Sequence, residues 1–173
     1  MDNPIIIREL AKSEIRDLEY FFYEAIFIPA GQRKPDRDII YHPELSKYFK
    51  DFGKETDVCL VAVLGGKSIG AVWTRVFPET EKGYGYVDPL TPELSMSVAP
   101  PYRQQGTGTR LLQTMIEKLI QLGYHQVSLS VDKLNYASAW YPKFGFETVE
   151  QNGESVTMVK RLKNNPQTKK LLI

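Results

Sequence analysis

The chain has 173 residues, of which 42% are hydrophobic and 25% are charged, and its formal net charge is +1. This length suits one domain with a substantial core, and the balanced charge argues against general electrostatic binding to nucleic acid or to an anionic membrane. Cys59 is the single cysteine, which excludes an internal disulfide and a thiolate metal cluster, and we expect no bound metal.

The N-terminus, Met-Asp-Asn-Pro, lacks the basic and apolar regions of a signal peptide. No apolar run approaches the roughly 20 residues that span a bilayer. We therefore expect a cytoplasmic protein.

The first third of the chain predicts one strand, two helices and a connecting loop. Residues 5–10 are mostly apolar and predict a short strand. Residues 14–28 carry apolar side chains at helical spacing, and Pro29 ends this predicted helix. The segment 29–43 is rich in proline and charge and predicts a loop, after which 43–52 predicts a second helix.

The next segment predicts a hairpin followed by a long connection. Residues 57–64 and 67–77 predict two strands, joined by the tight turn that Gly65 and Gly66 favour. Residues 78–92 contain several prolines and glycines and predict an irregular connection. Loops of this length are often functional.

The stretch 94–123 predicts a strand, a turn and a helix. Apolar residues alternate with serines over 94–98, which is typical of a strand with unlike faces. Two prolines then end the strand, since neither can donate a ladder hydrogen bond. From Leu111 the apolar residues recur at helical spacing, and Gly123 stands where a helix C-terminal cap belongs.

The turn between this strand and helix contains Gly106 and Gly108. Glycine lets the backbone approach a ligand closely, and the free N–H groups of a helix N-terminus, with the macrodipole behind them, favour an anion such as a pyrophosphate. Arg103 offers a charge-assisted contact to the same anion. A glycine pair at a strand–helix turn is also typical of a tight connection without a ligand.

Two common phosphate motifs do not match this turn. The dinucleotide-binding pattern requires a third glycine where Leu111 stands. The P-loop requires Lys and then Ser or Thr after its glycines, whereas Gly108 is followed by Thr109 and Arg110. A nucleotide-binding α/β protein is therefore disfavoured, although it stays an alternative.

The last third predicts a strand at 126–132, a helix at 134–144 and two further strands. The strands at 146–149 and 156–162 flank an Asn-Gly pair at 152–153, the strongest short-range hairpin signal. The predicted order is βααβββαβαββ.

The strand–helix–strand unit around 94–131 indicates an α/β (α+β mixed) fold in which helices flank a mixed sheet. We expect a single domain over 1–162. Residues 163–173 are polar and lysine-rich and predict a mobile tail.

Two motifs in the right order give the chain a resemblance to a known family. The run 98–112, Val-Ala-Pro-Pro-Tyr-Arg-Gln-Gln-Gly-Thr-Gly-Thr-Arg-Leu-Leu, resembles the acyl-coenzyme A loop of the GNAT superfamily of N-acetyltransferases, Arg/Gln-x-x-Gly-x-Gly/Ala. The run 135–146 is similar to that family's Asn…Ala…Leu-Tyr-x-Lys-x-Gly-Phe segment, but it is one residue shorter after the Asn and has Pro142 in an unusual place. The resemblance covers roughly 57–162.

The resemblance implies a single GNAT-like domain whose mixed, mostly antiparallel central sheet splays at the cofactor site. It also implies acetyl-CoA as co-substrate, with its pyrophosphate on the backbone N–H groups of the glycine turn and its pantetheine arm along the strand near Val98. The implied cofactor-binding residues are Met96, Val98, Arg103, Gln104, Gln105, Gly106, Thr107, Gly108, Thr109, Asn135 and Tyr141. Taken alone, Asn135 is more typical of a helix cap than of a ligand contact.

The resemblance further implies two catalytic residues. Tyr141 matches the family's tyrosine and is our candidate general acid for the departing thiolate, the alternative being a tyrosine that only packs. Glu93 at the start of the central strand is our candidate general base, the alternative being an exposed glutamate at a strand end. His42 is an outside candidate, and His125 is interpreted as structural.

The acceptor is left open by the sequence. In the family the regions corresponding to 28–43 and 78–92 wall the acceptor side, and here they carry aromatic residues and charges of both signs. A primary amine on a small molecule fits as well as one on a peptide or protein, acetylated by direct transfer through a ternary complex. The alternative is a non-catalytic acyl-CoA-binding or regulatory module, and either would be a monomer or a homodimer.

Overall fold

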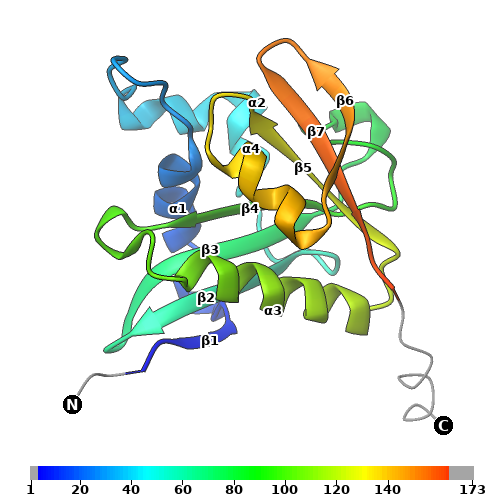
Figure 1. Cartoon of the computed structure of the whole chain (residues 1–173). Helices are drawn as coiled ribbons and strands as arrows, with labels where there is room; N and C mark the ends of the chain where they lie inside the picture. Colours follow the sequence, from blue (N-terminus) through cyan, green and yellow to red (C-terminus); the bar gives the residue numbers. More distant parts are fainter. Residues whose placement is uncertain (1–3, 164–173) are drawn as a thin grey trace, which may run out of the picture.

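Figure 1 shows the computed structural model, which describes residues 4–163 of the chain. Within these residues seven strands form one sheet in the order β1-β2-β3-β4-β5-β7-β6. The strands are β1 (Ile6–Glu9), β2 (Val58–Leu64), β3 (Lys67–Arg75), β4 (Glu93–Val98), β5 (Gln126–Asp132), β6 (Glu147–Asn152) and β7 (Ser155–Arg161). The helices are α1 (Asp17–Ala25), α2 (Pro43–Ser46), α3 (Thr107–Gln121) and α4 (Ala137–Trp140), and 3-10 turns lie at Lys12–Glu14, Arg37–Tyr41, Glu79–Glu81, Pro100–Tyr102 and Tyr141–Phe144. The predicted α/β class, a mixed sheet flanked by helices, is confirmed.

The centre of the sheet opens between β4 and β5. Every other pairing in the sheet is antiparallel, whereas these two strands run parallel and share one register pair, Glu93 opposite Ser128. The Ser128 amide also donates to the Pro92 carbonyl at 3.0 Å. Beyond this point the strands diverge, so among the described residues the β5 side of 94–98 has no ladder partner. The expected splay of a mostly antiparallel sheet is therefore confirmed.

Two hydrophobic cores lie on opposite faces of the sheet, with α3 covering one face and α1 the other (Figure 1). Successive side chains of a strand alternate between faces, so each strand contributes to both cores. The α3 core includes Leu60, Val72, Leu94, Leu111, Met115 and Leu129. The α1 core includes Phe21, Phe22, Tyr48, Val61 and Trp73. Glu93, next to Leu94 in β4, therefore faces the α1 side.

The first two helices are shorter than the sequence patterns indicate. α1 ends at Ala25 because the backbone is extended at Ile26. The second predicted helix stops after α2, and its remainder forms turns in which Asp51 has a left-handed φ of 53°. The carbonyls of Lys47 and Lys50 accept hydrogen bonds from a buried arginine side chain. None of the helices within 4–163 is long and apolar enough to cross a membrane.

The fourth predicted helix, 134–144, is also divided. α4 begins only at Ala137, whose N–H donates to the Asn135 side chain at 3.0 Å. It continues as a 3-10 turn from Tyr141, where Pro142 lacks an N–H to donate.

The C-terminal hairpin turns one residue later than predicted. Asn152 pairs with Ser155 as the last residue of β6, so the two-residue turn is Gly153-Glu154, with Gly153 at a φ of 57°. Of the predicted tail at 163–173, all but Lys163 lies outside the described residues.

Candidate active site

A cavity of about 870 Å³ opens where β4 and β5 diverge. It is bounded by the end of α1 and the loop after it, by α2, by β4, by the glycine turn and by the start of α4. Its lining includes most of the residues that the sequence singles out: Glu93, Met96, Val98, Arg103, Gln104, Gly106, Gly108, Thr109, Asn135 and Tyr141. The fold therefore brings both predicted motifs and both predicted catalytic residues to one cavity.

Two predicted residues do not line this cavity. Gln105 is exposed, and its side chain donates to the Pro101 carbonyl at 3.1 Å. The Thr107 side chain is buried, and its hydroxyl has no hydrogen-bond partner within the described residues. The side chains of these two residues therefore take no part in lining the cavity.

The glycine turn presents a series of backbone N–H groups at the N-terminus of the 15-residue helix α3. Gln104 and Gly106 both have left-handed φ angles, 58° and 81°. The N–H of Arg110 is the first to bond back, to the Gly106 carbonyl at 3.1 Å. The N–H groups of Thr107 to Thr109 come before it, and no earlier turn of the helix offers a carbonyl to accept their hydrogen bonds. A concave run of free N–H groups at a helix N-terminus can hold an anion.

Arg103 ties the glycine turn to α1. Its Nε donates to the Val98 carbonyl at 2.8 Å, and its guanidinium forms an ion pair with Glu24 at 3.1 Å. The other oxygen of Glu24 binds Lys34 at 2.9 Å. Glu24 is thus shared by two cations at the cavity wall, and the three residues together carry a net charge of +1.

Glu93 is buried, with only 4% of its surface exposed, so the interpretation as an exposed strand-end glutamate is wrong. Its Oε1 accepts hydrogen bonds from the Tyr48 hydroxyl at 2.7 Å and from the Gly85 amide at 2.9 Å. Its Oε2 is buried without a hydrogen-bond partner among the described residues. Burial raises the pKa of the Glu93 carboxyl, and the hydrogen bonds from Tyr48 and Gly85 partly oppose this rise.

The segment Gly83-Tyr84-Gly85, part of the 78–92 connection that was expected on the acceptor side, covers Glu93, and this contact with Glu93 was not predicted. A Cβ atom on Gly85 would lie 2.6 Å from the backbone carbon of Leu129, and one on Gly83 would lie 2.1 Å from Glu93 Oε2. Only glycine can approach a neighbouring backbone this closely. The Gly-Tyr-Gly pattern within the long 78–92 loop was the sequence feature that could have indicated this close approach.

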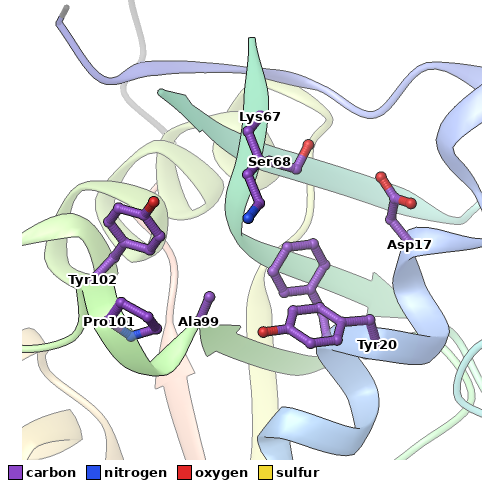
Figure 2. A pocket seen from close by; sticks show the side chains of 8 residues that line it. Asp17, Tyr20, Lys67, Ser68, Ala99, Pro101 and Tyr102 are labelled. Carbon is purple, nitrogen blue, oxygen red and sulfur yellow. The ribbon is translucent and has the colours of Figure 1, made fainter. Parts of the chain in front are cut away.

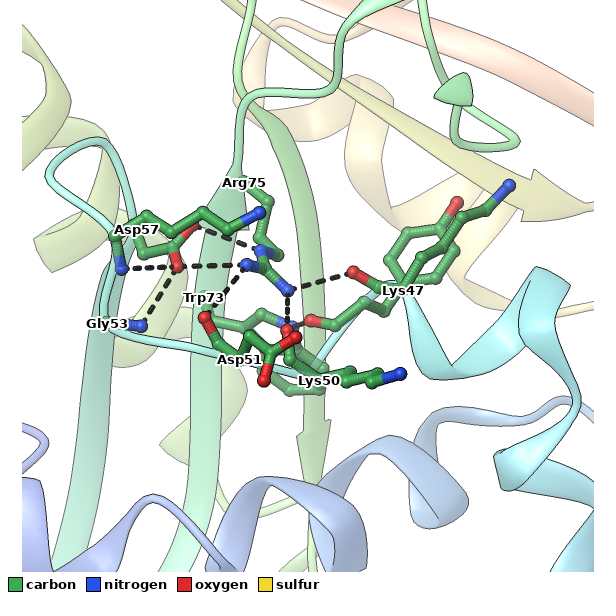
Figure 3. A network of polar contacts seen from close by, with 9 residues as sticks. Lys47, Lys50, Asp51, Gly53, Asp57, Trp73 and Arg75 are labelled. Atoms are coloured by element: carbon green, nitrogen blue, oxygen red, sulfur yellow. Dashed lines mark hydrogen bonds and ion pairs between the residues drawn. The ribbon is translucent and has the colours of Figure 1, made fainter. Parts of the chain in front are cut away.

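Tyr48 was also missed, and a buried arginine holds it in place (Figure 3). Arg75 pairs with Asp57 through Nε at 3.1 Å and donates to the carbonyls of Lys47 and Lys50 at 2.9 and 2.6 Å. The Trp73 indole N–H donates to the Tyr48 carbonyl at 3.1 Å. These bonds fix the backbone on both sides of Tyr48 and thereby aim its hydroxyl at Glu93.

Tyr141 and Asn135 lie on the α4 side of the cavity. Tyr141 is 8% exposed, its hydroxyl has no hydrogen-bond partner within residues 4–163, and burial raises its pKa. The phenol is therefore protonated across the neutral range. Asn135 Oδ1 accepts the N–H of Ala137, the first residue of α4, from two positions earlier in the chain, which leaves the Asn135 amide NH₂ free of that bond.

Residues 14–146 match the model of the Acetyltransferase (GNAT) family. The chain belongs to this family. No curated protein matches it in sequence.

Several solved GNAT structures share the fold. The ribosomal-protein-S18-alanine N-acetyltransferase of Escherichia coli is 17% identical with a TM-score of 0.64, and the match covers 92% of this chain and 95% of that one. PaiA N-acetyltransferase of Thermoplasma acidophilum, solved with coenzyme A, is 19% identical with a TM-score of 0.67, covering 91% and 99%. Phosphinothricin acetyltransferase of Sinorhizobium meliloti, solved with AcCoA, is 17% identical with a TM-score of 0.65, covering 94% and 91%.

The two histidines lie outside the lining of this GNAT cavity. His42 is exposed, and its Nδ1 accepts the Glu44 N–H at 3.3 Å as the cap of α2. His125 is exposed, and its carbonyl accepts the Leu162 N–H at 2.8 Å. Among the residues that the structure describes, no three His, Cys, Asp or Glu side chains gather in a way that could hold a metal ion.

A second cavity of about 440 Å³ lies between α1, the β2–β3 hairpin and the 3-10 turn after β4 (Figure 2). The phenol rings of Tyr20 and Tyr102 border it, together with Asp17, Lys67 and Pro101. It contains none of the predicted site residues. The larger cavity is therefore the candidate active site.

Proposed function

We propose that this GNAT protein transfers the acetyl group of acetyl-CoA to a primary amine by direct transfer in a ternary complex. The observation that carries this proposal is the single cavity that unites the glycine turn with Glu93 and Tyr141. Support for the co-substrate also comes from GNAT relatives of the same fold that were solved with coenzyme A or AcCoA.

Acetyl-CoA is held by backbone groups in this proposal. The free amides over 104–109 bind its pyrophosphate, and Arg103 leaves Glu24 or shares it to add a charge-assisted contact. The unpaired side of β4 near Met96 and Val98 forms backbone hydrogen bonds with the pantetheine arm, much as it would with an added strand. The Asn135 amide NH₂ donates to the same arm.

Glu93 acts as the general base through a water molecule. The acceptor enters as an ammonium ion, and its proton passes by way of water to the Glu93 carboxylate. A carboxyl whose pKa is raised by burial is a stronger base than an ordinary one, which suits this step near neutral pH.

Tyr141 acts as the general acid. The amine nitrogen bonds to the carbonyl carbon of the thioester, and the carbon–sulfur bond breaks. The Tyr141 hydroxyl gives its proton to the departing sulfur, and backbone N–H groups of β4 stabilise the carbonyl oxygen as it gains charge. The acetylated nitrogen then loses its remaining extra proton, which restores the Tyr141 phenol, and the products are an acetamide and free coenzyme A.

The proposal is tested in two stages. Thermal shift and calorimetry with acetyl-CoA, CoA, ATP and NAD come first, because a ligand at 100 times its Kd stabilises a fold by about 2.7 kcal/mol. A thiol-release assay over an amine panel follows. Acetyl-CoA binding without transfer to any amine would favour a non-catalytic module, and selective binding of ATP or NAD would favour a nucleotide-binding protein.

A further inference from the structure

Building on the proposed function, we infer that the acceptor is a linear diamine or polyamine without a carboxylate. One amine of this acceptor lies at Glu93, its methylene chain lies on the aromatic wall of the cavity, and a second ammonium binds Asp132. The inference stands on the charges, the spacing and the surface chemistry of the cavity.

The charges of the cavity are unbalanced toward acid. Of its charged lining residues, Glu24 is paired with both Lys34 and Arg103, a group with a net charge of +1 that becomes the neutral Glu24–Lys34 pair once Arg103 turns to the pyrophosphate of the proposed co-substrate. Glu93 and Asp132 also line the cavity, and neither forms an ion pair within the described residues. The cavity therefore offers two unpaired carboxylates and no unpaired cation among its described lining residues. Such a site attracts cations and rejects a ligand that carries a carboxylate.

The two acids lie on one face of the sheet at a fixed separation. Ser128 stands opposite Glu93 in the register, and Asp132 follows it by four residues on β5. At about 3.3 Å per residue, Asp132 lies roughly 13 Å further along β5 than Ser128, so at least this distance separates it from Glu93, and the even spacing puts both side chains on the same face. This distance suits a long diamine that binds both acids at once.

An aromatic part of the cavity lining suits a methylene chain. The Tyr48 ring stacks on Phe22 at 5.5 Å and on Tyr84 at 6.3 Å, and all three rings line the cavity. Leu45 also lines the cavity and packs on the same cluster. Tyr84 is 55% exposed, so its ring is available to a ligand. Aromatic faces favour both a methylene chain and an adjacent ammonium.

The test uses steady-state thiol release with two matched pairs of amines. Comparison of 1,8-diaminooctane with octylamine tests the second ammonium, and comparison of 1,5-diaminopentane with lysine tests the carboxylate. We expect kcat/KM at least about tenfold higher for the first member of each pair, since a hydrogen-bonded charge contributes at that scale.

The variant Asp132→Asn isolates the distal contact. The new amide keeps an oxygen that can accept the Leu134 N–H, which Asp132 now accepts at 2.8 Å, so the local turn is retained. We expect KM for 1,8-diaminooctane to rise about tenfold while kcat and the KM for octylamine stay unchanged. Glu147→Gln, which neutralises an exposed acid on β6 outside the cavity, is the matched control and should change neither.

Calorimetric titration of 1,8-diaminooctane into the protein saturated with CoA separates this inference from the proposed function. Weaker binding by Asp132→Asn without any acetyl transfer would uphold the acceptor site and overturn the catalytic proposal. Transfer that is fastest to octylamine, to lysine or to a peptide amine would overturn the acceptor inference and leave the acetyltransferase proposal standing. If Asp132→Asn left both the KM and the affinity for 1,8-diaminooctane unchanged, the acceptor inference would likewise be overturned and the acetyltransferase proposal would stand.

Discussion

The Tyr48 hydroxyl donates a hydrogen bond of 2.7 Å to the Glu93 carboxylate across 45 positions of the sequence. The same hydroxyl accepts the Tyr84 N–H at 2.6 Å. Tyr48 therefore joins the turn after α2, the 78–92 loop and the start of β4 at the point where the sheet opens.

Tyr48→Phe removes a bond that stabilises the charged form of Glu93, so the pKa of Glu93 should rise further. The ascending limb of the pH–rate profile is then expected to move to higher pH, with kcat reduced at neutral pH and acetyl-CoA affinity unchanged. Tyr41→Phe, which removes the exposed hydroxyl bonded to Glu19, is the control. Identical pH profiles for the two variants would exclude a positioning role for Tyr48.

Glu93→Gln should abolish the ascending limb altogether, because a neutral amide cannot take the amine proton. The amide keeps an oxygen acceptor for Tyr48 and Gly85. The raised pKa also means that the folded protein resists ionisation of Glu93, so this group favours folding at low pH and loses that contribution as pH rises from about 4.3 through its folded pKa. Denaturation curves should therefore show less loss of stability with rising pH in Glu93→Gln. A pH–rate profile that matches wild type would rule out Glu93 as the base.

Tyr141→Phe should lower kcat about 10²-fold or more, since general acid catalysis contributes at that scale. Because burial raises the pKa of Tyr141, no descending limb from this phenol is expected near neutral pH. Tyr124→Phe, on a tyrosine outside the cavity after α3, serves as control. Full kcat in Tyr141→Phe with the true acceptor would end the assignment.

Asn135 has two separable roles that a pair of variants distinguishes. Asn135→Ala should cost about 1 kcal/mol of stability through loss of the cap, and Asn135→Ser should retain most of it. Both should weaken acetyl-CoA binding roughly two- to tenfold if the amide NH₂ donates to the ligand, as loss of one neutral hydrogen bond implies. If calorimetry showed a change of less than about twofold in acetyl-CoA affinity for both variants, Asn135 would have only the capping role.

The two glycines around Tyr84 should respond differently to alanine. Gly85→Ala places a Cβ atom against the backbone of β5 and should destabilise the protein by about 1–3 kcal/mol. Gly83→Ala places its Cβ atom against the Glu93 carboxylate instead, so the carboxylate must move. We therefore expect kcat to fall, with a smaller loss of stability than in Gly85→Ala. Chemical denaturation and kcat measured together check this contrast, and equal stability losses with unchanged kcat would contradict it.

The sequence by itself determined the family and much of the fold. The glycine turn at 103–108 and the segment at 135–146 are local patterns, and local patterns report local backbone geometry: tight turns, a helix N-terminus and a strand of period two. These patterns predicted the mixed sheet, and the family resemblance that they carry implied its central splay and ten of the residues that line the cavity. Tyr141 was located by its offset from Gly145 in the second motif, and Glu93 by its place at the start of the central strand.

Only the tertiary structure decided the surroundings of these residues. The burial of Glu93, its bond to Tyr48 and the close approach of Gly83 and Gly85 arise between segments far apart in the chain. Helix ends were decided in the same way, since the carbonyls after α2 bind the Arg75 side chain instead of continuing a helix. Such contacts depend on which strands pair and which faces pack, and no local period in the sequence encodes them. The spacing of Glu93 and Asp132 follows from strand register, which becomes fixed only when β4 and β5 meet.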